Sequence, residues 1–391
     1  MTKSIKALIN SQVLSWARAF LGFDLDYVSH KTGFDPHLIN NWEAGKESPT
    51  ISQLRKMADI YRFPIAIFYL PEPPTLLSNR PKDRRFLPGY EIGEITPELS
   101  CEFRLAEERR EIALELFNNI RVQPKEFGYK ASLRSSPEAI AKMIRLLLQV
   151  SYQEQSSWRN PRIAFNKWRE KLENRDILVF QGVDVPLEVM RGYSMYFNVL
   201  PIIGVNRKDA YNARSFSLLH EFCHLLLRTG SICNIDEKNS GLSAHDVKIE
   251  SFCNNVAGSV LIPAENLAKE PNLSVACSKG EAGEEAINCL ARIYCVSKIA
   301  VVKRLHFLKY VDDKFYRDKY NKYLQEFISH KPKSAGFIHP VENLISSAGK
   351  KLVGVVLENL NKNYINISDF SSYLGIKIKH LSRLQDHFML I

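Results

Sequence analysis

The sequence predicts a mainly helical α+β protein with one small β-sheet in its central part. Residues 1–70 contain five successive helical patterns and no strand pattern. Three short runs of strand character lie between residues 176 and 206, and two of them are bounded by Gly or Pro. Residues 278–391 again have helical patterns. We therefore expect helices at both ends of the chain and the β-sheet between them.

The composition is that of a globular protein. The 391 residues allow two or three domains of ordinary size, and a content of 45% hydrophobic and 25% charged residues excludes a disordered chain. No run of 18 or more apolar residues occurs, and the N-terminal segment lacks the pattern of a secretion signal, so we expect no membrane partner. The seven cysteines are scattered without a CxxC pair, which favours reduced thiols and a cytoplasmic location.

The positive charge is concentrated toward the end of the chain. The net charge is +10, yet residues 1–80 hold only nine Lys/Arg against seven Asp/Glu. Residues 301–391 hold fifteen Lys/Arg against eight Asp/Glu. Such a distribution suits an anionic partner, and a basic surface that only keeps the protein soluble explains it equally well.

Proline-rich and turn-forming segments predict the domain boundaries. Residues 1–70 form a first domain, and "YLPEPPTLLSNRPKD" marks a linker at about 71–90. The remainder is expected to divide into a mixed domain at 91–277, a helical subdomain at 278–330 and a basic helical region at 331–391.

The first domain is predicted to consist of five short helices. Gly33 ends the second helix, and Asp35 followed by Pro36 begins the third. Thr50 or Ser52 caps the fourth. The predicted helices span residues 8–21, 25–32, 36–43, 50–61 and 64–70.

The mixed domain begins with two predicted helices and continues with three strands. The helices span 97–120 and 136–150. The strands are the runs "DILVFQGVDV", "GYSMYF" and "LPIIGVN", at residues 176–185, 192–197 and 200–206. They are followed by a helix that contains "SLLHEFCHLLL" at 217–227, a polar loop at 229–246 and a helix at 247–262 that ends before Pro263.

Two histidines and a glutamate interrupt the apolar pattern of the helix at 217–227. Burying such groups is costly unless a partner satisfies them. His220 and His224 are four residues apart, so their rings lie on one side of the helix and can share an ion. Glu221 can reach a water bound to that ion. This is the HExxH spacing of zinc peptidases, and a pair of hydrogen-bonded core histidines is the alternative.

A third metal ligand is sought among the acidic residues that follow. No histidine stands at the metzincin spacing, which excludes that class. The helical phase favours Glu250, because it flanks the apolar stripe of its helix and Asn254 follows one turn later. A solvated surface acid is the alternative. The acidic residues considered are Asp236, Glu237, Asp246 and Glu250.

The segments around these residues resemble the ImmA/IrrE family of zinc-dependent metallopeptidases. The family's second motif, E-x-x-A-N-x-F-A-x-x-L-L-M-P, aligns with "ESFCNNVAGSVLIP" at 250–263. Cys253 replaces its alanine and Val256 its phenylalanine, and both keep a small or apolar side chain. "LPIIGVN" and Arg214 also fit the segment that precedes the family's metal helix. The resemblance covers roughly residues 90–310.

This resemblance implies a zincin-like metallopeptidase domain that uses Zn²⁺. It makes Glu250 the third zinc ligand beside His220 and His224. It also implies a protein substrate, a DNA-binding transcriptional repressor or an antitoxin-like partner, that is cleaved in a stress or mobile-element response.

The implied chemistry assigns Glu221 the role of general base toward the attacking water. The group that stabilises the oxyanion stays open, since each candidate is more readily explained as structural. The run at 192–197 is expected to supply an edge strand for an extended substrate. The candidates for the oxyanion are His245, Arg214 and Tyr211.

The segment at 26–61 resembles the helix-turn-helix domains of the lambda-repressor/Xre type. The resemblance implies that the helix beginning near Pro36 lies in the major groove of double-stranded DNA. It directs His37, Asn40 and Asn41 toward base edges, and asparagine suits adenine. The residues that carry it, among which Lys46 is a further DNA-binding candidate, are Trp42, Glu43, Gly45, Lys46, Pro49, Thr50, Leu54 and Ala58.

Two observations weigh against DNA as the partner of the first domain. Its surplus of positive charge is small for a protein that neutralises several phosphates. Asp24, Asp26 and Asp35 also lie near the expected path of the duplex. A protein-docking role is the alternative.

Two helical pairs follow the peptidase-like segment. "LARIYCVSKIAVVKRLHFLKYV" at 290–311 turns at Cys295 and is capped by Ser297, and it resembles the helix-turn-helix-like subdomain attached to this peptidase family. In "INISDFSSYLGIKIKHLSRL", we expect Ser368 to cap a short helix and Gly375 to make the turn before a basic helix. These helices hold DNA or the repressor, or they form a plain helical lid.

The sequence thus leaves three hypotheses of function. The first is a cytosolic zinc endopeptidase fused to a DNA-binding-type domain. The second is a DNA-binding regulator or antitoxin in which the peptidase fold is mainly a partner-binding module. The third is a zinc-stabilised scaffold without turnover. The intact HExxH motif together with Glu250 favours the first.

Overall fold

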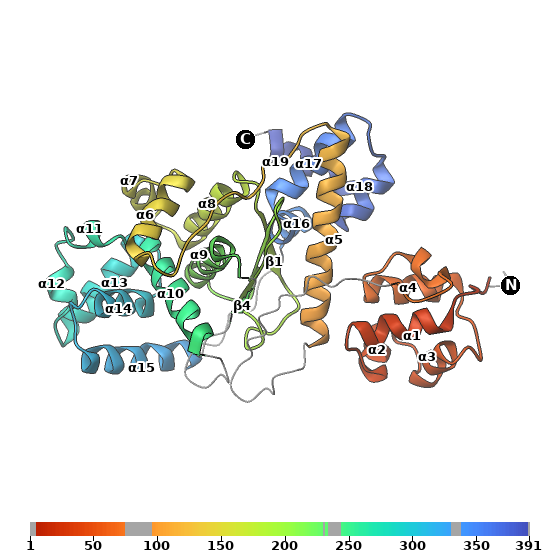
Figure 1. Cartoon of the computed structure of the whole chain (residues 1–391), viewed down its shortest axis with the longest axis horizontal. Coiled ribbons are helices and arrows are strands. Elements are labelled where there is room, and N and C mark those ends of the chain that lie inside the picture. The colour runs from red at the N-terminus through yellow and green to blue at the C-terminus, as the bar shows by residue number, and fades with distance from the viewer. Residues whose placement is uncertain (1–4, 75–95, 230, 234–243, 330–337, 390–391) are drawn as a thin grey trace. The chain divides into compact units, whose positions relative to one another are not determined.

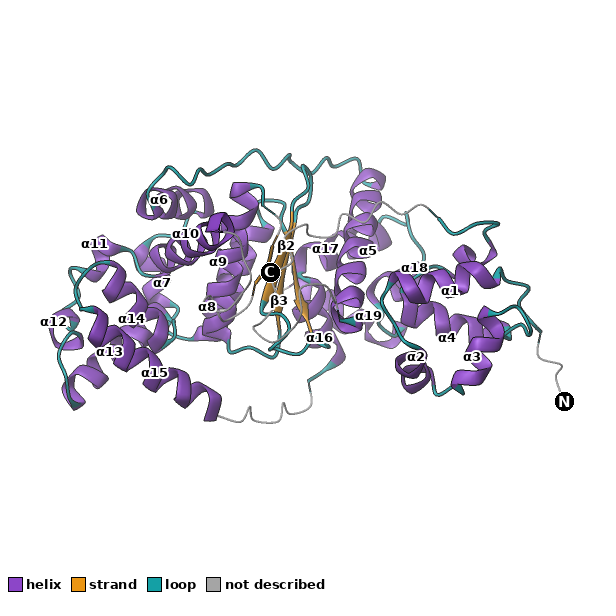
Figure 2. Cartoon of the chain, turned by 60° about the horizontal axis from the view of Figure 1, so that its bottom comes forward, coloured by secondary structure: helices purple, strands orange, loops and turns teal. Residues whose placement is uncertain are grey.

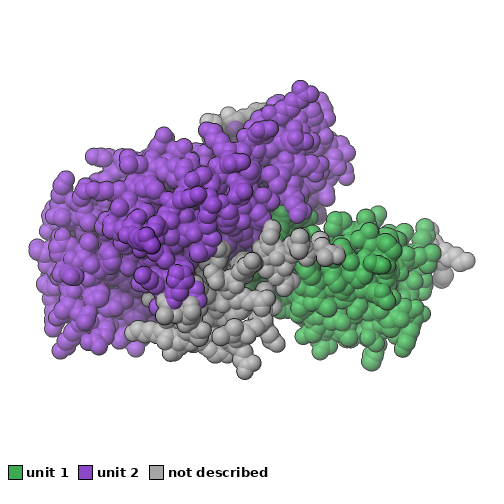
Figure 3. Space-filling model, in the orientation of Figure 1, with its two compact units in different colours: residues 1–80, 90–108 green, residues 81–89, 109–391 purple. Residues whose placement is uncertain are grey.

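A computed structural model describes residues 5–74, 96–229, 231–233, 244–329 and 338–389 (Figure 1). The chain divides into two compact units, residues 1–80 with 90–108 and residues 81–89 with 109–391 (Figure 3). The helix α5 (Pro97–Asn119) contributes residues to both units. Most of the predicted linker at 71–90 lies outside the described residues.

The first unit has the five short helices that the sequence predicts, with bounds that agree to within a few residues. Gly33 ends α2 with a φ of 69°, and the Asp35 side chain accepts a hydrogen bond from the backbone of His37. Thr50 and Gln53 form a capping box that begins α4. The fifth is a 3-10 helix. The bounds are α1 Ser11–Phe20, α2 Leu25–Thr32, α3 Pro36–Glu43, α4 Ile51–Tyr61 and η1 Ile65–Tyr69.

A bidentate ion pair fixes α3 against α1. The Arg18 guanidinium donates to both carboxylate oxygens of Glu43, at 2.8 and 2.9 Å. Ile39 and Trp42 are the buried residues of α3. The opposite face of α3 is therefore the one that meets solvent.

The second unit contains a four-stranded sheet in the order β1-β3-β2-β4. β1 and β3 are parallel, and β2 is antiparallel to both β3 and β4. β1 and β3 are buried along their whole length, as expected for strands covered on both faces. The bounds are β1 Leu178–Gly182, β2 Gly192–Met195, β3 Ile202–Asn206 and β4 Ser231–Cys233.

The three predicted strands are confirmed, but the predicted role of the 192–197 run is wrong. β2 is an inner strand, because β4 pairs with it on the side away from β3. β4 lies in the segment predicted to be a polar loop. An extended chain that approached the sheet from this side would therefore meet β4.

Helices cover both faces of the sheet (Figures 1 and 2). On one face, α8 (Pro161–Glu173) contacts β1, and α9 (Tyr211–Leu227) contacts β2, β3 and β4. On the other face, α16 (Pro340–Ala348) packs on β1. α10 (Ala244–Leu261) packs on α9 and begins three residues earlier than the sequence predicts. The sheet thus serves as the platform on which α9 is held.

The other helices of the second unit lie around this sheet and its covering helices. Ser297 caps α14, as predicted. Ser368 does not cap α18: the cap is Asn366, two residues earlier than predicted, and it forms a capping box with Asp369. The bounds are α6 Pro137–Leu148, α7 Tyr152–Ser157, α11 Ala264–Leu267, α12 Leu273–Ala276, α13 Glu281–Tyr294, α14 Lys298–Phe307, α15 Asp313–Ser329, α17 Lys350–Asn361, α18 Ile367–Leu374, η2 Ile378–His380 and α19 Leu381–Met389.

None of the helices in the described ranges combines the length and the apolar character that a membrane crossing requires.

Candidate metal centre

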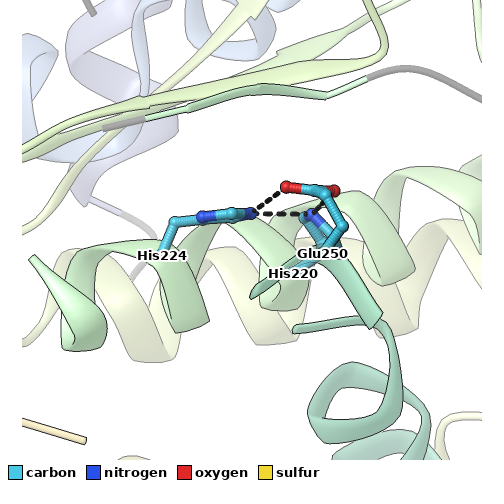
Figure 4. Close-up of side chains that lie close together, drawn as sticks. All are labelled: His220, His224 and Glu250. Carbon is cyan, nitrogen blue, oxygen red and sulfur yellow. Dashed lines mark hydrogen bonds and ion pairs between the residues drawn. The ribbon is translucent and has the colours of Figure 1, made fainter. Parts of the chain in front are cut away.

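The helices α9 and α10 bring the histidines His220 and His224 together with Glu250, which lies far from them in the sequence (Figure 4). The Nε2 atoms of His220 and His224 lie 3.0 Å apart. The Glu250 carboxylate places one oxygen 3.2 Å from Nε2 of His220 and the other 3.0 Å from Nε2 of His224. The structure thus places Glu250 beside both histidines, where the sequence analysis expects a third ligand.

The spacing and the chemistry of these atoms fit one metal ion. Two imidazole nitrogens and a carboxylate oxygen are a ligand set that Zn²⁺ favours. Ligands bound at about 2.0–2.1 Å in a tetrahedron are ~3.3 Å apart, close to the separations seen here. The triangle of donor atoms therefore has the size that one tetrahedral ion requires.

Burial of these three side chains favours positive charge beside Glu250. His220 and His224 are at most 1% exposed and Glu250 is 8% exposed. Burial by itself raises the pKa of the Glu250 carboxyl, but the two histidines outweigh this effect and hold its pKa far below the usual range. An ionised carboxylate with so little contact with water needs positive charge beside it, which either protonated histidines or a bound ion can supply.

A hydrogen bond orients the ring of His224. Its Nδ1 lies 3.0 Å from the Thr229 hydroxyl oxygen. When Nδ1 carries the proton, it donates to this hydroxyl and leaves Nε2 free to bind a metal. Thr229 reaches the ring because α9 ends at Leu227 and the next residue, Arg228, has a φ of 57°, which turns the chain back over the last helical turn.

Thr229→Val is expected to weaken Zn²⁺ binding by about 10- to 100-fold, because it removes the group that orients His224 while keeping the shape of the side chain. The affinity can be measured by competition with a chromophoric chelator. Thr229→Ser, which keeps the hydroxyl, is the matched control and should stay close to the original affinity. Equal affinities for the valine and serine variants would show that Thr229 does not orient the ligand.

Glu221 is fully buried on α9 and lies against β2. A Cβ atom at Gly192 would be 3.1 Å from Cγ and 3.2 Å from Oε1 of Glu221. Glycine at this position of β2 therefore leaves the room that the Glu221 side chain occupies. Gly192 and Thr229 were not predicted from the sequence, because a Thr after a helix and a Gly at the start of a strand are common without any role in a site.

The three candidates for oxyanion stabilisation are placed in different surroundings. The Arg214 guanidinium donates to the Asp209 carbonyl at 2.7 Å and to Oε1 of Gln181 at 2.9 Å, and it lies 4.2 Å from the centre of the Tyr211 ring. Through these contacts, Arg214 and Tyr211 hold the start of α9 in place. His245 is exposed near the start of α10. None of these contacts joins Arg214 or Tyr211 to His220, His224 or Glu250.

The DNA-binding candidates lie on α3 and just beyond it. His37, Asn40 and Lys46 are exposed. The Asn41 side-chain amide instead donates to the carboxylate of Glu47 at 3.2 Å. Asn40 is therefore better placed than Asn41 to contact a partner.

A comparison with protein families matches the part of the chain that contains this centre. The search of curated proteins gave no match. Residues 175–306, which contain the β-sheet strands β1 to β4, α9, α10 and all three metal-binding side chains, match the family model of the IrrE N-terminal-like domain, peptidase family M78. The match supports a metallopeptidase-like function for this part of the chain.

Proposed function

We propose that the protein is a zinc-dependent endopeptidase. The observation that carries the proposal is the buried triangle of His220, His224 and Glu250, which has the donor types and the size that suit Zn²⁺. The match of residues 175–306 to a peptidase family agrees with it. A purely structural ion would not require a fourth ionisable side chain at the HExxH position of Glu221.

Each residue of the centre has a distinct task in this function. Zinc held by His220, His224 and Glu250 would supply the Lewis acidity that activates a water molecule. The Glu221 carboxylate takes a proton from the attacking water and passes it to the nitrogen of the leaving amine. The Thr229 hydroxyl keeps the His224 ring in one orientation, and Gly192 leaves space for Glu221.

The proposal predicts proteolysis that depends on zinc. The full-length protein is stripped with a chelator, reloaded with Zn²⁺, and incubated with extract of cells that lack it. We expect new protein N-termini, measured by mass spectrometry, only with the reloaded protein. A protein that binds one zinc per chain and yields no new N-termini from any extract would favour the scaffold or the partner-binding hypothesis.

We further propose that the substrate is a DNA-binding repressor or an antitoxin-like protein. The support is the resemblance of residues 26–61 to Xre-type domains, together with the five short helices of the first unit. Such a domain in the same chain can bring the peptidase to the DNA site that its substrate occupies. Among the new N-termini, those from DNA-binding proteins should therefore predominate.

A regulator that reads DNA is the second candidate, and the exposure of His37 and Asn40 on α3 favours testing it. Asn40→Ala is expected to weaken binding to a duplex selected from a random pool by about 1–3 kcal/mol, the value of one bidentate contact to adenine. Binding is measured by fluorescence anisotropy at fixed salt. Lys46→Ala is the control, since loss of a phosphate contact weakens all duplexes alike. Failure to select any duplex would leave a protein-docking role for the first unit.

A further inference from the structure

A pocket adjoins the metal-binding side chains. Its volume is about 650 Å³, and residues of α9, α10, α14 and α15 line it. Phe216 precedes His220 by one turn of α9, and the centres of their rings are 6.3 Å apart. Asn254 follows Glu250 by one turn of α10, on the same side of the helix. Two residues of the pocket wall, Phe216 and Asn254, thus lie one helical turn from His220 and Glu250, and the size of the pocket is typical of ligand pockets.

Two lysines give this pocket a positive side. Lys303 and Lys309 both line it, and the ammonium of Lys303 lies 5.6 Å from the centre of the Tyr320 ring. Within the parts of the chain that the structure describes, no carboxylate forms an ion pair with either lysine. Their charges are therefore available to a ligand that enters the pocket.

The acidic residues of the pocket are already engaged by the protein. Asp312 accepts a hydrogen bond from the backbone N–H of Phe315 at 2.7 Å, at the start of α15. Asp313 lies 2.7 Å from Nε2 of His306. Both carboxylates thus have hydrogen-bond partners of their own, and neither is paired with Lys303 or Lys309.

Arg304 also lines the pocket, but its charge is engaged by the protein. Its guanidinium is buried, donates to the Ile262 carbonyl at 2.9 Å and to the Ser259 hydroxyl at 2.8 Å, and pairs with Glu138. These bonds hold α14 against the end of α10. Lys303 therefore stands on a helix that is bonded to α10, and Lys309 follows the end of that helix.

We propose that this pocket receives an acidic side chain of the substrate, Asp or Glu, at a fixed position near the bond that is cut. The inference rests on the proposed peptidase function and adds the substrate's chemistry to it. The lysine ammonium groups bind the carboxylate, and the aromatic ring of Phe216 packs against the apolar part of the same residue. Cleavage sites of this protein are then marked by an acidic residue.

The test uses the full-length, zinc-loaded protein and a peptide library prepared from a digested proteome. Cleavage positions are read by mass spectrometry. Asp and Glu should be enriched about tenfold over Asn and Gln at one position relative to the cut, which corresponds to one charge-assisted contact. In the double variant Lys303→Glu with Lys309→Glu, the enrichment at that position should change to Lys and Arg.

Lys314→Glu is the matched control, because Lys314 is an exposed lysine of α15 that does not line the pocket. It should keep the preference for Asp and Glu. The milder double variant Lys303→Gln with Lys309→Gln should lose the preference, and it replaces the charge reversal if that variant does not fold.

The outcomes separate this inference from the proposed function. No cleavage of peptides or of extract proteins by the zinc-loaded protein overturns both. Cleavage without enrichment of acidic residues overturns the inference and leaves the peptidase function standing. An acidic preference that survives in both double variants also overturns it, since the lysines then have no part in selection.

Discussion

Glu221→Gln is expected to lower the rate of peptide-bond cleavage by about 10²- to 10⁴-fold and to leave one metal ion per chain in place. The amide keeps the shape of the carboxylate but cannot take a proton from the attacking water. The three metal-binding side chains are untouched. Cleavage is measured as the initial rate on a substrate protein found in the extract experiment, and the metal by elemental analysis of the same preparation.

The surroundings of Glu221 can accept glutamine without a change in packing. The side chain is fully buried and fits into the space that Gly192 leaves on β2, and glutamine fills the same volume. His224→Ala is the contrasting variant, because it should lose both the metal and the activity. A Glu221→Gln protein that still cuts within a few-fold of the original rate would show that another group accepts the proton.

The metal centre was predictable to the extent that helical geometry determines it. Four residues make about one turn, so the spacing of His220 and His224 alone places their rings together. Glu250 could be selected because its position beside an apolar stripe fixed the side of α10 on which it lies. In both cases the decisive information is local, and the structure confirms the placement.

The parts that could not be predicted depend on contacts between distant segments. β4 is a three-residue strand in a polar segment, and only its pairing with β2 makes it a strand. The contact of Gly192 with Glu221 joins a strand to a helix nearly thirty residues later. The cap of α18 was placed at Ser368 instead of Asn366. Both are good capping residues, and the sequence does not tell at which of them the helix begins.

The region at 331–391 was expected to hold a partner or to form a lid. In the structure, one of its helices, α16, is also hydrogen-bonded to α8 and β1. The guanidinium of Arg169 on α8 donates to the Ser346 carbonyl of α16 at 2.7 Å and to the Val179 carbonyl of β1. The side-chain amide of Gln181 on β1 also donates to Ser346, at 2.7 Å. α16 is therefore built into the platform that carries α9.

Arg169→Met is expected to lower the free energy of unfolding by about 3–5 kcal/mol. Arg169 and Glu173 form a buried ion pair with an Nε–Oε1 distance of 3.0 Å, and the variant leaves Glu173 buried without its cation. It also removes the hydrogen bonds to Val179 and Ser346. Unfolding in urea, followed by the fluorescence of the buried tryptophans, measures the loss. Lys167→Met on the same helix is the control, because its exposed pair with Glu170 is worth less than about 1 kcal/mol.

The stability deficit of Arg169→Met should also depend on pH. Burial raises the pKa of the Glu173 carboxyl, and Arg169 is the first group that opposes this shift. Without Arg169, the folded protein keeps a proton on Glu173 that the unfolded chain releases above its ordinary pKa. The unfolded state then binds fewer protons, so the stability of the variant falls as the pH rises. We expect a larger deficit at pH 8 than at pH 5; a deficit that is the same at both would mean that solvent reaches Glu173 once the arginine is gone.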